Sequence, residues 1–258
     1  MEPDPRRWLT VLRASHARLC TLVGSLSPTD LGAPSYDTEW TVAQVLSHLG
    51  SQAEIFSMFL DAGVSGRQPP GQEAFPSVWD AWNKRTPQQQ AHDSLEATDR
   101  FVTRLEGLSD ETLATPIKLF GMDLLIGDTA RLRVAEHAVH SWDIAVAFNP
   151  AASVAPDAVA LLIDSVAALV ARGGKPQGSN FDLHVHTTAP ERDFMLSVHA
   201  TAELRAFTGE PSSGSLDLPA EALVRLVYGR LDEAHTPALN LVADEITLDD
   251  VRRVFPGF

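Results

Sequence analysis

Apolar residues recur at helical spacing through most of the first 150 residues. They do so over residues 6–26, 42–59 and 79–105, and again from Asp128 to about residue 148. An apolar residue at every third or fourth position is typical of amphipathic helices that bury one face. Residues 1–150 are therefore predicted to form a four-helix bundle of the up-and-down type.

Short local signals predict where these helices begin and end. Thr41, followed three residues later by Gln44, indicates a capping box at the start of the second helix. Asp128 is expected to cap the fourth helix, and Pro87 lies near the start of the third helical region or at a break in it. Residues 63–75 are rich in Pro and Gly and are predicted to form a long loop, of the kind that often lines a site.

The pattern changes after residue 150. Residues 149–156 are rich in small residues and proline, which indicates a domain boundary, and a further apolar helix is predicted over residues 156–172. Residues 181–188 and 194–204 alternate between apolar and polar with a period of two, which is typical of a β-hairpin. Shorter elements are expected to follow: a strand at 214–218, a helix starting at Pro219, a strand at 238–242 and a terminal helix at 248–255. Residues 151–258 are therefore predicted to form a small α+β domain.

Composition excludes several classes of function. Of the 258 residues, 44% are hydrophobic and 21% charged, as in ordinary globular proteins, and the formal net charge is −14. So acidic a chain does not favour nucleic acid or an anionic membrane as a partner. The first residues lack the apolar run of a signal peptide and no apolar run reaches about 20 residues, so a cytoplasmic location is expected. The single cysteine, Cys20, excludes an internal disulfide and is expected to be a buried, inert thiol.

Candidate metal ligands lie on the fourth helix. Glu136, His140 and Asp143 are spaced at i, i+4 and i+7, so they share one face of a helix. The best candidate for a third ligand is His48 on the second helix, at the margin of its apolar face. Two imidazoles and one carboxylate leave coordination positions open, as catalytic metals require, and the set suits zinc or non-haem iron. From spacing alone, ordinary solvated or hydrogen-bonded side chains are the more common interpretation of such residues.

Two further groups of polar residues have alternative interpretations. Asp143 is either an acceptor that holds the His140 imidazole or part of a surface ion pair. His184, His186 and His199 share one face of the predicted hairpin, where a solvated surface is favoured over a second metal site. His137 lies about 100° around the helix from Glu136 and is not expected to bind the same ion.

The motifs of several large enzyme classes are absent from the sequence. There is no Gly-x-x-x-x-Gly-Lys-Ser/Thr loop, no Gly-x-Gly-x-x-Gly, no Gly-x-Ser-x-Gly and no His-Glu-x-x-His. Nucleotide-dependent and serine-hydrolase chemistry therefore have no support.

Together, these residues resemble a known family. The stretch from Trp40 to Leu49, followed about ninety residues later by the stretch from Arg133 to Asp143, is similar to the mycothiol-dependent maleylpyruvate isomerases. These are DinB-like metal-binding bundles, and residues 223–231 resemble a helix of the family's sterol-carrier-like C-terminal domain. A composition rich in Ala and Arg is what a GC-rich bacterial genome would produce. It fits the resemblance, because mycothiol is made by actinobacteria.

The resemblance implies a metal- and thiol-dependent enzyme. A divalent metal, most often zinc, would be held by His48, Glu136 and His140, and would receive mycothiol as a thiolate. The reaction implied is isomerisation of a maleylpyruvate-like substrate, or transfer of the thiol to another electrophile. Arg230 would bind a substrate carboxylate, with Arg225 as the second choice. The expected partners are small molecules, and the chain is expected to be a monomer or homodimer.

Two other functions are compatible with the same residues. One is a metal-binding protein without catalysis, in which the C-terminal domain binds a ligand for regulation or storage. The other is a non-haem iron oxygenase that uses the same two histidines and one carboxylate.

Overall fold

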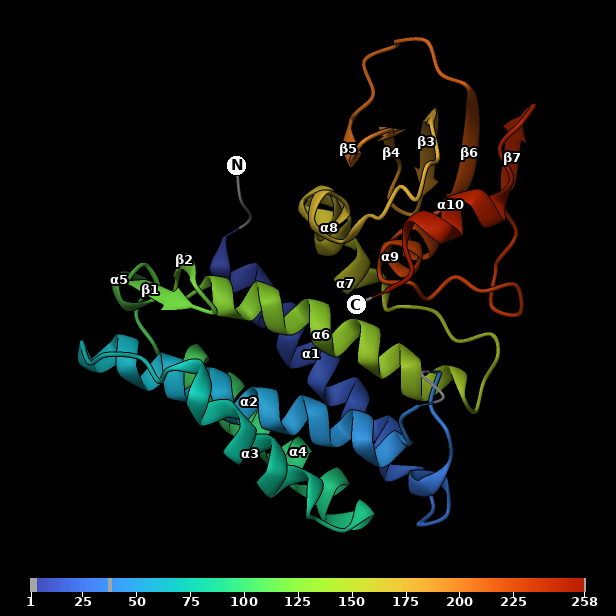
Figure 1. Cartoon of the computed structure of the whole chain (residues 1–258). Helices are drawn as coiled ribbons and strands as arrows, with labels where there is room; N and C mark the ends of the chain where they lie inside the picture. The colour runs from blue at the N-terminus through green and yellow to red at the C-terminus, as the bar shows by residue number, and fades with distance from the viewer. Residues whose placement is uncertain (1–3, 37–38, 258) are drawn as a thin grey trace. The chain divides into compact units, whose positions relative to one another are not determined.

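The computed structural model describes residues 4–36 and 39–257. Its contacts divide the chain into two compact units, Met1–Ala152 and Ser153–Phe258. The first is helical and the second combines a sheet with helices (Figure 1). The predicted fold class, a four-helix bundle followed by a small α+β unit, is confirmed.

Four long helices build the first unit. They are α1 (Pro5–Gly24), α2 (Val42–Ser65), α4 (Pro87–Glu106) and α6 (Asp128–Val146). The connections contain the short helices α3 (Phe75–Asn83) and α5 (Asp110–Leu113), the 3-10 turns η1 (Asp30–Gly32) and η2 (Gln72–Ala74), and a hairpin of β1 (Pro116–Leu119) and β2 (Met122–Leu125).

The order of the helices around the bundle differs from the prediction. Among the four long helices, α1 packs against α6 and α4, and α2 packs against the same two helices. The consecutive helices α1 and α2 are therefore diagonal partners, whereas neighbours in sequence are neighbours in space in an up-and-down bundle. The connection between them, residues 25–41, is long enough to cross the end of the bundle. Hydrophobic periodicity shows which face is buried but not against which helix, so this part of the prediction is wrong.

Helix ends follow local chemistry with one correction. The capping box of Thr41 and Gln44 is present at the start of α2. Pro87 begins α4, so the third helical region is two helices that break after residue 83. Asp128 is not the N-cap of α6: Gly127 takes that position, and the Asp128 carboxylate accepts a hydrogen bond from the Leu125 backbone N–H.

The predicted 63–75 loop is shorter than expected. Helix α2 continues to Ser65 and ends at Gly66, whose φ of 64° is the left-handed conformation that favours glycine at a helix end. The turn η2 and the start of α3 occupy residues 72–75.

Glycine allows α2 to approach α3 closely at Gly50, about two turns beyond the start of α2. A Cβ on Gly50 would lie 2.2 Å from atoms of the Trp82 ring. Trp82 is itself buried, and its indole N–H donates to Glu54 at 2.8 Å. The segment that carries His48 is thus fixed by a large side chain that fits only against glycine.

The second unit is a five-stranded sheet with helices. Its strand order is β5-β4-β3-β6-β7, in which β3 and β6 are parallel and the other pairs antiparallel. The strands are β3 (Phe181–Thr188), β4 (Arg192–Val198), β5 (Ala202–Ala206), β6 (Gly214–Pro219) and β7 (Asn240–Ala243). The helices are α7 (Pro156–Leu162), α8 (Val166–Gly173), α9 (Ala220–Val227) and α10 (Leu248–Val254), with the turn η3 (Ile163–Ser165) between α7 and α8.

Three predicted elements of this unit need correction. Residues 194–204 are two antiparallel strands, in which Val198 pairs with Ala202 across a three-residue turn. Val198 and Ala202 are both buried, and they are an even number of residues apart. The alternation of apolar and polar residues therefore continues unchanged across the turn, and the sequence pattern does not show where the turn is. Pro219 ends β6 and α9 begins at Ala220. The helix predicted over residues 156–172 is interrupted by η3.

None of the described helices combines the length and the apolar character that a membrane crossing requires.

Candidate metal centre

His48, Glu136 and His140 meet between α2 and α6. One ligand atom from each lies within 4.8 Å of the others. His48 Nε2 lies 3.1 Å from Glu136 Oε2, and His140 Nε2 lies 3.5 Å from the same oxygen. The three side chains are between 14% and 32% exposed, so they are sheltered but open on one side.

These separations suit ligands of a single ion. Zinc binds imidazole nitrogen and carboxylate oxygen at about 2.0–2.2 Å, which places neighbouring tetrahedral ligands about 3.3 Å apart. The two measured separations, 3.1 and 3.5 Å, lie on either side of that value. Two neutral imidazoles and one carboxylate are also a common donor set for zinc and non-haem iron. The residues present therefore fit a divalent metal.

Asp143 holds the far side of the His140 ring. Its Oδ2 lies 2.8 Å from His140 Nδ1, and its side chain is completely buried. A carboxylate at this position keeps the proton on Nδ1 and directs the lone pair of Nε2 towards Glu136. Because Asp143 is buried, it is not the surface ion pair that the sequence also allowed.

Trp40 lies against both imidazoles. Its ring is tilted against His48 with 5.3 Å between centroids, and stacked near His140 at 6.5 Å. It stands at the end of the α1–α2 connection, directly before the capping box, so the start of α2 sets its position.

Gln52 and Arg133 extend the site away from the histidines. Gln52 Nε2 donates to Glu136 Oε2 at 2.7 Å, and Gln52 Oε1 accepts from Arg133 Nη1 at 2.5 Å. Arg133 also donates to the Leu49 carbonyl at 3.1 Å and is completely buried.

The electrostatics of the site favour an ionised carboxylate. Burial by itself raises the pKa of Glu136, but the bonds with His140 and His48 outweigh it and hold that pKa well below its ordinary value. Burial lowers the pKa of His48. Burial also opposes protonation of His140, yet the bonds to Asp143 and Glu136 outweigh it and raise the pKa of that ring.

His137 faces away from this cluster, as its place on the helix predicts. It is completely buried, and its ring meets His16 edge to face with 6.0 Å between centroids. Neither of its ring nitrogens has a hydrogen-bond partner in the described residues, and burial holds its pKa well below the ordinary value. It is a neutral core residue.

Cys20 is a partly buried thiol beside His16. Its Sγ lies 3.5 Å from His16 Nε2. Burial raises the pKa of the thiol, which opposes the thiolate that a nucleophile needs.

Arg230 and Arg225 lie in the second unit. Gly229, which precedes Arg230, has φ 74° and allows the backbone of Gly257 to approach within 2.6 Å of a Cβ position. Arg230 Nη1 donates to the Tyr228 carbonyl. Arg225 is buried, pairs with both carboxylate oxygens of Glu221, and also donates to two carbonyl oxygens. Arg225 is therefore committed to holding its own unit together, and a substrate role for Arg230 stays a prediction.

The three sheet histidines form small hydrogen-bonded groups. His184 and His186 both contact one oxygen of Asp193, at 2.8 and 3.1 Å. His199 contacts Asp182 at 3.2 Å. These side chains are 27–48% exposed, in keeping with the solvated sheet face favoured by the sequence.

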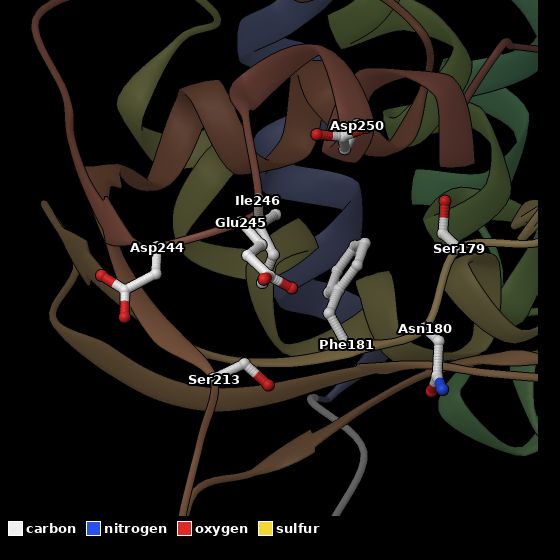
Figure 2. Close-up of a pocket in the computed structure, with 8 residues that line it drawn as sticks. All are labelled: Ser179, Asn180, Phe181, Ser213, Asp244, Glu245, Ile246 and Asp250. Carbon is white, nitrogen blue, oxygen red and sulfur yellow. The ribbon is translucent and has the colours of Figure 1, made fainter.

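A cavity of about 430 Å³ lies in the second unit (Figure 2). Its walls carry three acidic residues, Asp244, Glu245 and Asp250. Figure 2 shows that they do not converge, since the Asp244 carboxylate points away from the Phe181 ring at the centre and Asp250 lies above that ring on α10. Asp250 is already bonded to Thr247 as a helix cap. The cavity therefore lacks the converging oxygens of a cation site.

A second group of candidate ligands lies on the surface of α4. His92, Asp93 and Glu96 bring ligand atoms within 4.8 Å of one another, but His92 and Glu96 are 72% and 53% exposed. Their spacing of one helical turn explains their proximity without an ion.

Sequence reasoning missed Gln52, Arg133 and Trp40. A signal for Gln52 was present, because it follows His48 by four residues and so lies on the same face of α2. Arg133 precedes Glu136 by three residues, but a buried arginine is not expected from sequence.

Two crystal structures of one isomerase show the same fold. The crystal structure of the mycothiol-dependent maleylpyruvate isomerase matches with a TM-score of 0.66 and 15% identity, over 88% of this chain and 90% of that chain. A histidine-to-alanine mutant of that isomerase matches with the same score and coverage at 14% identity. YfiT from Bacillus subtilis, described as a probable metal-dependent hydrolase with an unusual four-helix bundle topology, matches with a TM-score of 0.44 and 19% identity, over 57% of this chain and 91% of that chain.

The sequence itself matches a family model. No curated protein sequence matches the chain significantly. The family described as the mycothiol maleylpyruvate isomerase N-terminal domain matches residues 12–145, which is more than half of the chain and contains all three candidate ligands. The resemblance noted in the sequence is confirmed, and the chain belongs to the mycothiol maleylpyruvate isomerase family.

Proposed function

We propose that this protein is a cytoplasmic metal- and thiol-dependent enzyme. It would isomerise a small maleylpyruvate-like substrate, or transfer mycothiol to a related electrophile. The observation that carries the proposal is the convergence of His48, Glu136 and His140 within 4.8 Å of one another. Family membership supports the choice of thiol.

The metal ligands would be His48, Glu136 and His140, and zinc is the ion that this donor set favours. When bound, a divalent ion lowers the pKa of a coordinating thiol, so that its sulfur is nucleophilic near neutral pH.

The protein's own residues prepare this site. Asp143 keeps the His140 proton on Nδ1 and leaves Nε2 free to bind. Trp40 covers the two imidazoles with an apolar surface, which restricts water on that side. The negative charge of Glu136 offsets a cation held between two neutral rings.

The proposed reaction needs no oxidant or reductant. The thiolate sulfur adds to a double bond conjugated with a carbonyl, and the bond order moves towards that carbonyl. The former double bond then rotates as a single bond, and the thiolate leaves as the double bond re-forms in the other geometry. Arg230 is the residue proposed to bind a substrate carboxylate, through the paired contacts that a guanidinium makes.

Metal content and thiol binding test this proposal. Elemental analysis of the purified protein is expected to give about one zinc per chain, as the ligand set of a single site implies. Mycothiol is expected to bind the wild type in a calorimetric titration, and not to bind His140→Ala. His48→Ala and Glu136→Ala are expected to lose both the metal and the turnover of maleylpyruvate.

Two results would contradict the proposal. A folded wild type that takes up no metal when zinc is supplied would mean that these three residues are ordinary bundle side chains. Full activity of Glu136→Ala would exclude a metal-dependent reaction at this position.

A further inference from the structure

Arg133 is a cation buried in the helical unit. It lies one helical turn before Glu136 and is completely buried, and burial lowers its pKa to about 10. Its hydrogen-bond partners within residues 4–36 and 39–257 are two neutral oxygens, the Leu49 carbonyl and the Gln52 side-chain carbonyl. Burying a guanidinium is costly, so such a residue is expected to have a specific role.

The contact with Arg133 determines how Gln52 is oriented. A guanidinium can only donate hydrogen bonds, so it must face the amide oxygen of Gln52. The amide nitrogen of Gln52 then faces Glu136, where it donates to Oε2 at 2.7 Å. Rotating the amide by 180° would place a donor against Arg133 and an acceptor against the carboxylate, and both contacts would become repulsive.

The same oxygen of Glu136 is the point where the site converges. His48 Nε2 lies 3.1 Å from Oε2 and His140 Nε2 lies 3.5 Å away. The bond from Gln52 is the shortest of the three contacts to this oxygen. Gln52 lies on α2, one turn beyond His48.

We propose that Gln52 is a positioning residue that holds the Glu136 carboxylate in its ligand conformation, and that Arg133 sets the orientation of Gln52. The inference rests on the proposed metal site. The Glu136 side chain has three rotatable bonds. If these bonds become ordered only when the metal binds, the loss of conformational entropy weakens the metal affinity. Partners that orient ligands in this way typically change metal affinity by about 10–100-fold.

The test is zinc affinity in Gln52→Met, which keeps the length of the side chain but cannot donate to Glu136. The dissociation constant, measured by competition with a chelator, is expected to rise about 10–100-fold. The absorption bands of the cobalt(II)-substituted protein are also expected to shift, because they report the arrangement of ligands around the ion. A purely structural role for Gln52 would leave that spectrum unchanged.

Gln90→Met is the matched control. Gln90 is a buried glutamine on α4 whose amide donates to the Trp82 carbonyl, away from the three ligands. Its loss is expected to lower stability without changing the zinc affinity or the cobalt spectrum.

Arg133→Met tests the second part of the inference. With the guanidinium removed, Gln52 is no longer held in one orientation, so zinc affinity is expected to fall in this variant too. The double variant is expected to be no weaker than Gln52→Met, because both changes remove the same support. If Gln52→Met is unfolded by circular dichroism, Gln52→Asn, whose amide is too short to reach Glu136, replaces it in the comparison.

The outcomes separate this inference from the proposed function. If the wild type binds zinc, His140→Ala does not, and Gln52→Met matches the wild type in affinity and spectrum, the positioning role is wrong and the metal site stands. If the folded wild type binds no zinc, both are wrong.

Discussion

At the scale of single residues, the His140 ring is held through one nitrogen and faces Glu136 with the other. Asp143 contacts Nδ1 at 2.8 Å, and Glu136 lies 3.5 Å from Nε2. The first contact is buried, so neither water nor salt competes with it. Replacing Asp143 therefore tests how far ring orientation governs metal binding.

Asp143→Asn is expected to weaken zinc binding about tenfold or more. The amide has the shape of the carboxylate but lacks its charge, so it makes the imidazole less basic. Competition with a chelator measures the dissociation constant. An unchanged constant would mean that the shape of residue 143, rather than its charge, orients the ring.

Cys20 is expected to react slowly with iodoacetamide. Burial raises the pKa of its thiol, and a raised acid pKa keeps the thiol protonated to higher pH, so less thiolate is present near pH 8. The rate at that pH is expected to be lower in the native protein than in the same protein in guanidinium chloride. An equal or faster native rate would reopen the possibility of a catalytic thiol.

At the scale of elements, α2 carries His48 and Gln52 and is fixed at two points. The capping box of Thr41 and Gln44 defines its start, and Gly50 allows the Trp82 ring to pack against its backbone. Both features lie within three turns of His48, the candidate metal ligand on this helix. The stability of this segment and the geometry of the site are therefore linked.

Gly50→Ala is expected to destabilise the protein by about 1–3 kcal/mol, the typical cost of forcing extra volume into a packed core. The new methyl group would overlap the buried Trp82 ring and would lie 2.9 Å from the Ser94 Cα. Thermal unfolding measures the loss.

Gly24→Ala is the control for this change. Gly24 is the last residue of α1, and a Cβ there meets no atom within 4 Å. Its substitution is expected to be neutral or to stabilise slightly, since alanine favours helix. Equal melting temperatures of the two variants would contradict the packing argument.

At the scale of the whole molecule, the chain divides by its contacts into Met1–Ala152 and Ser153–Phe258. The assignment of residues 1–150 and 151–258 as separate domains remains a prediction. The junction is accessible, because residues 149–151 are exposed.

Brief digestion with elastase is expected to cut first after Ala151 or Ala152, because the enzyme prefers small residues and exposed loops between domains are cleaved first. Two fragments close to residues 1–151 and 152–258 should accumulate, and mass spectrometry identifies their ends. First cleavage inside either unit, for example in the exposed segment 211–213, would contradict separate domains at this boundary.

The sequence by itself determined the local features of this protein. Periodicity located the long helices, and Thr41 with Gln44 marked the start of α2. The spacing of Glu136 and His140 placed two candidate ligands on one face of α6, because helical geometry depends only on neighbours along the chain.

The tertiary structure alone decided what depends on distant contacts. His48 and Glu136 are 88 residues apart, and they meet because α2 packs against α6. The diagonal placement of α1 and α2 and the bonds from Arg133 to Gln52 have no counterpart in local patterns. The physical reason is that a hydrophobic stripe favours burial in general, whereas side-chain packing and hydrogen-bond geometry select which surfaces meet.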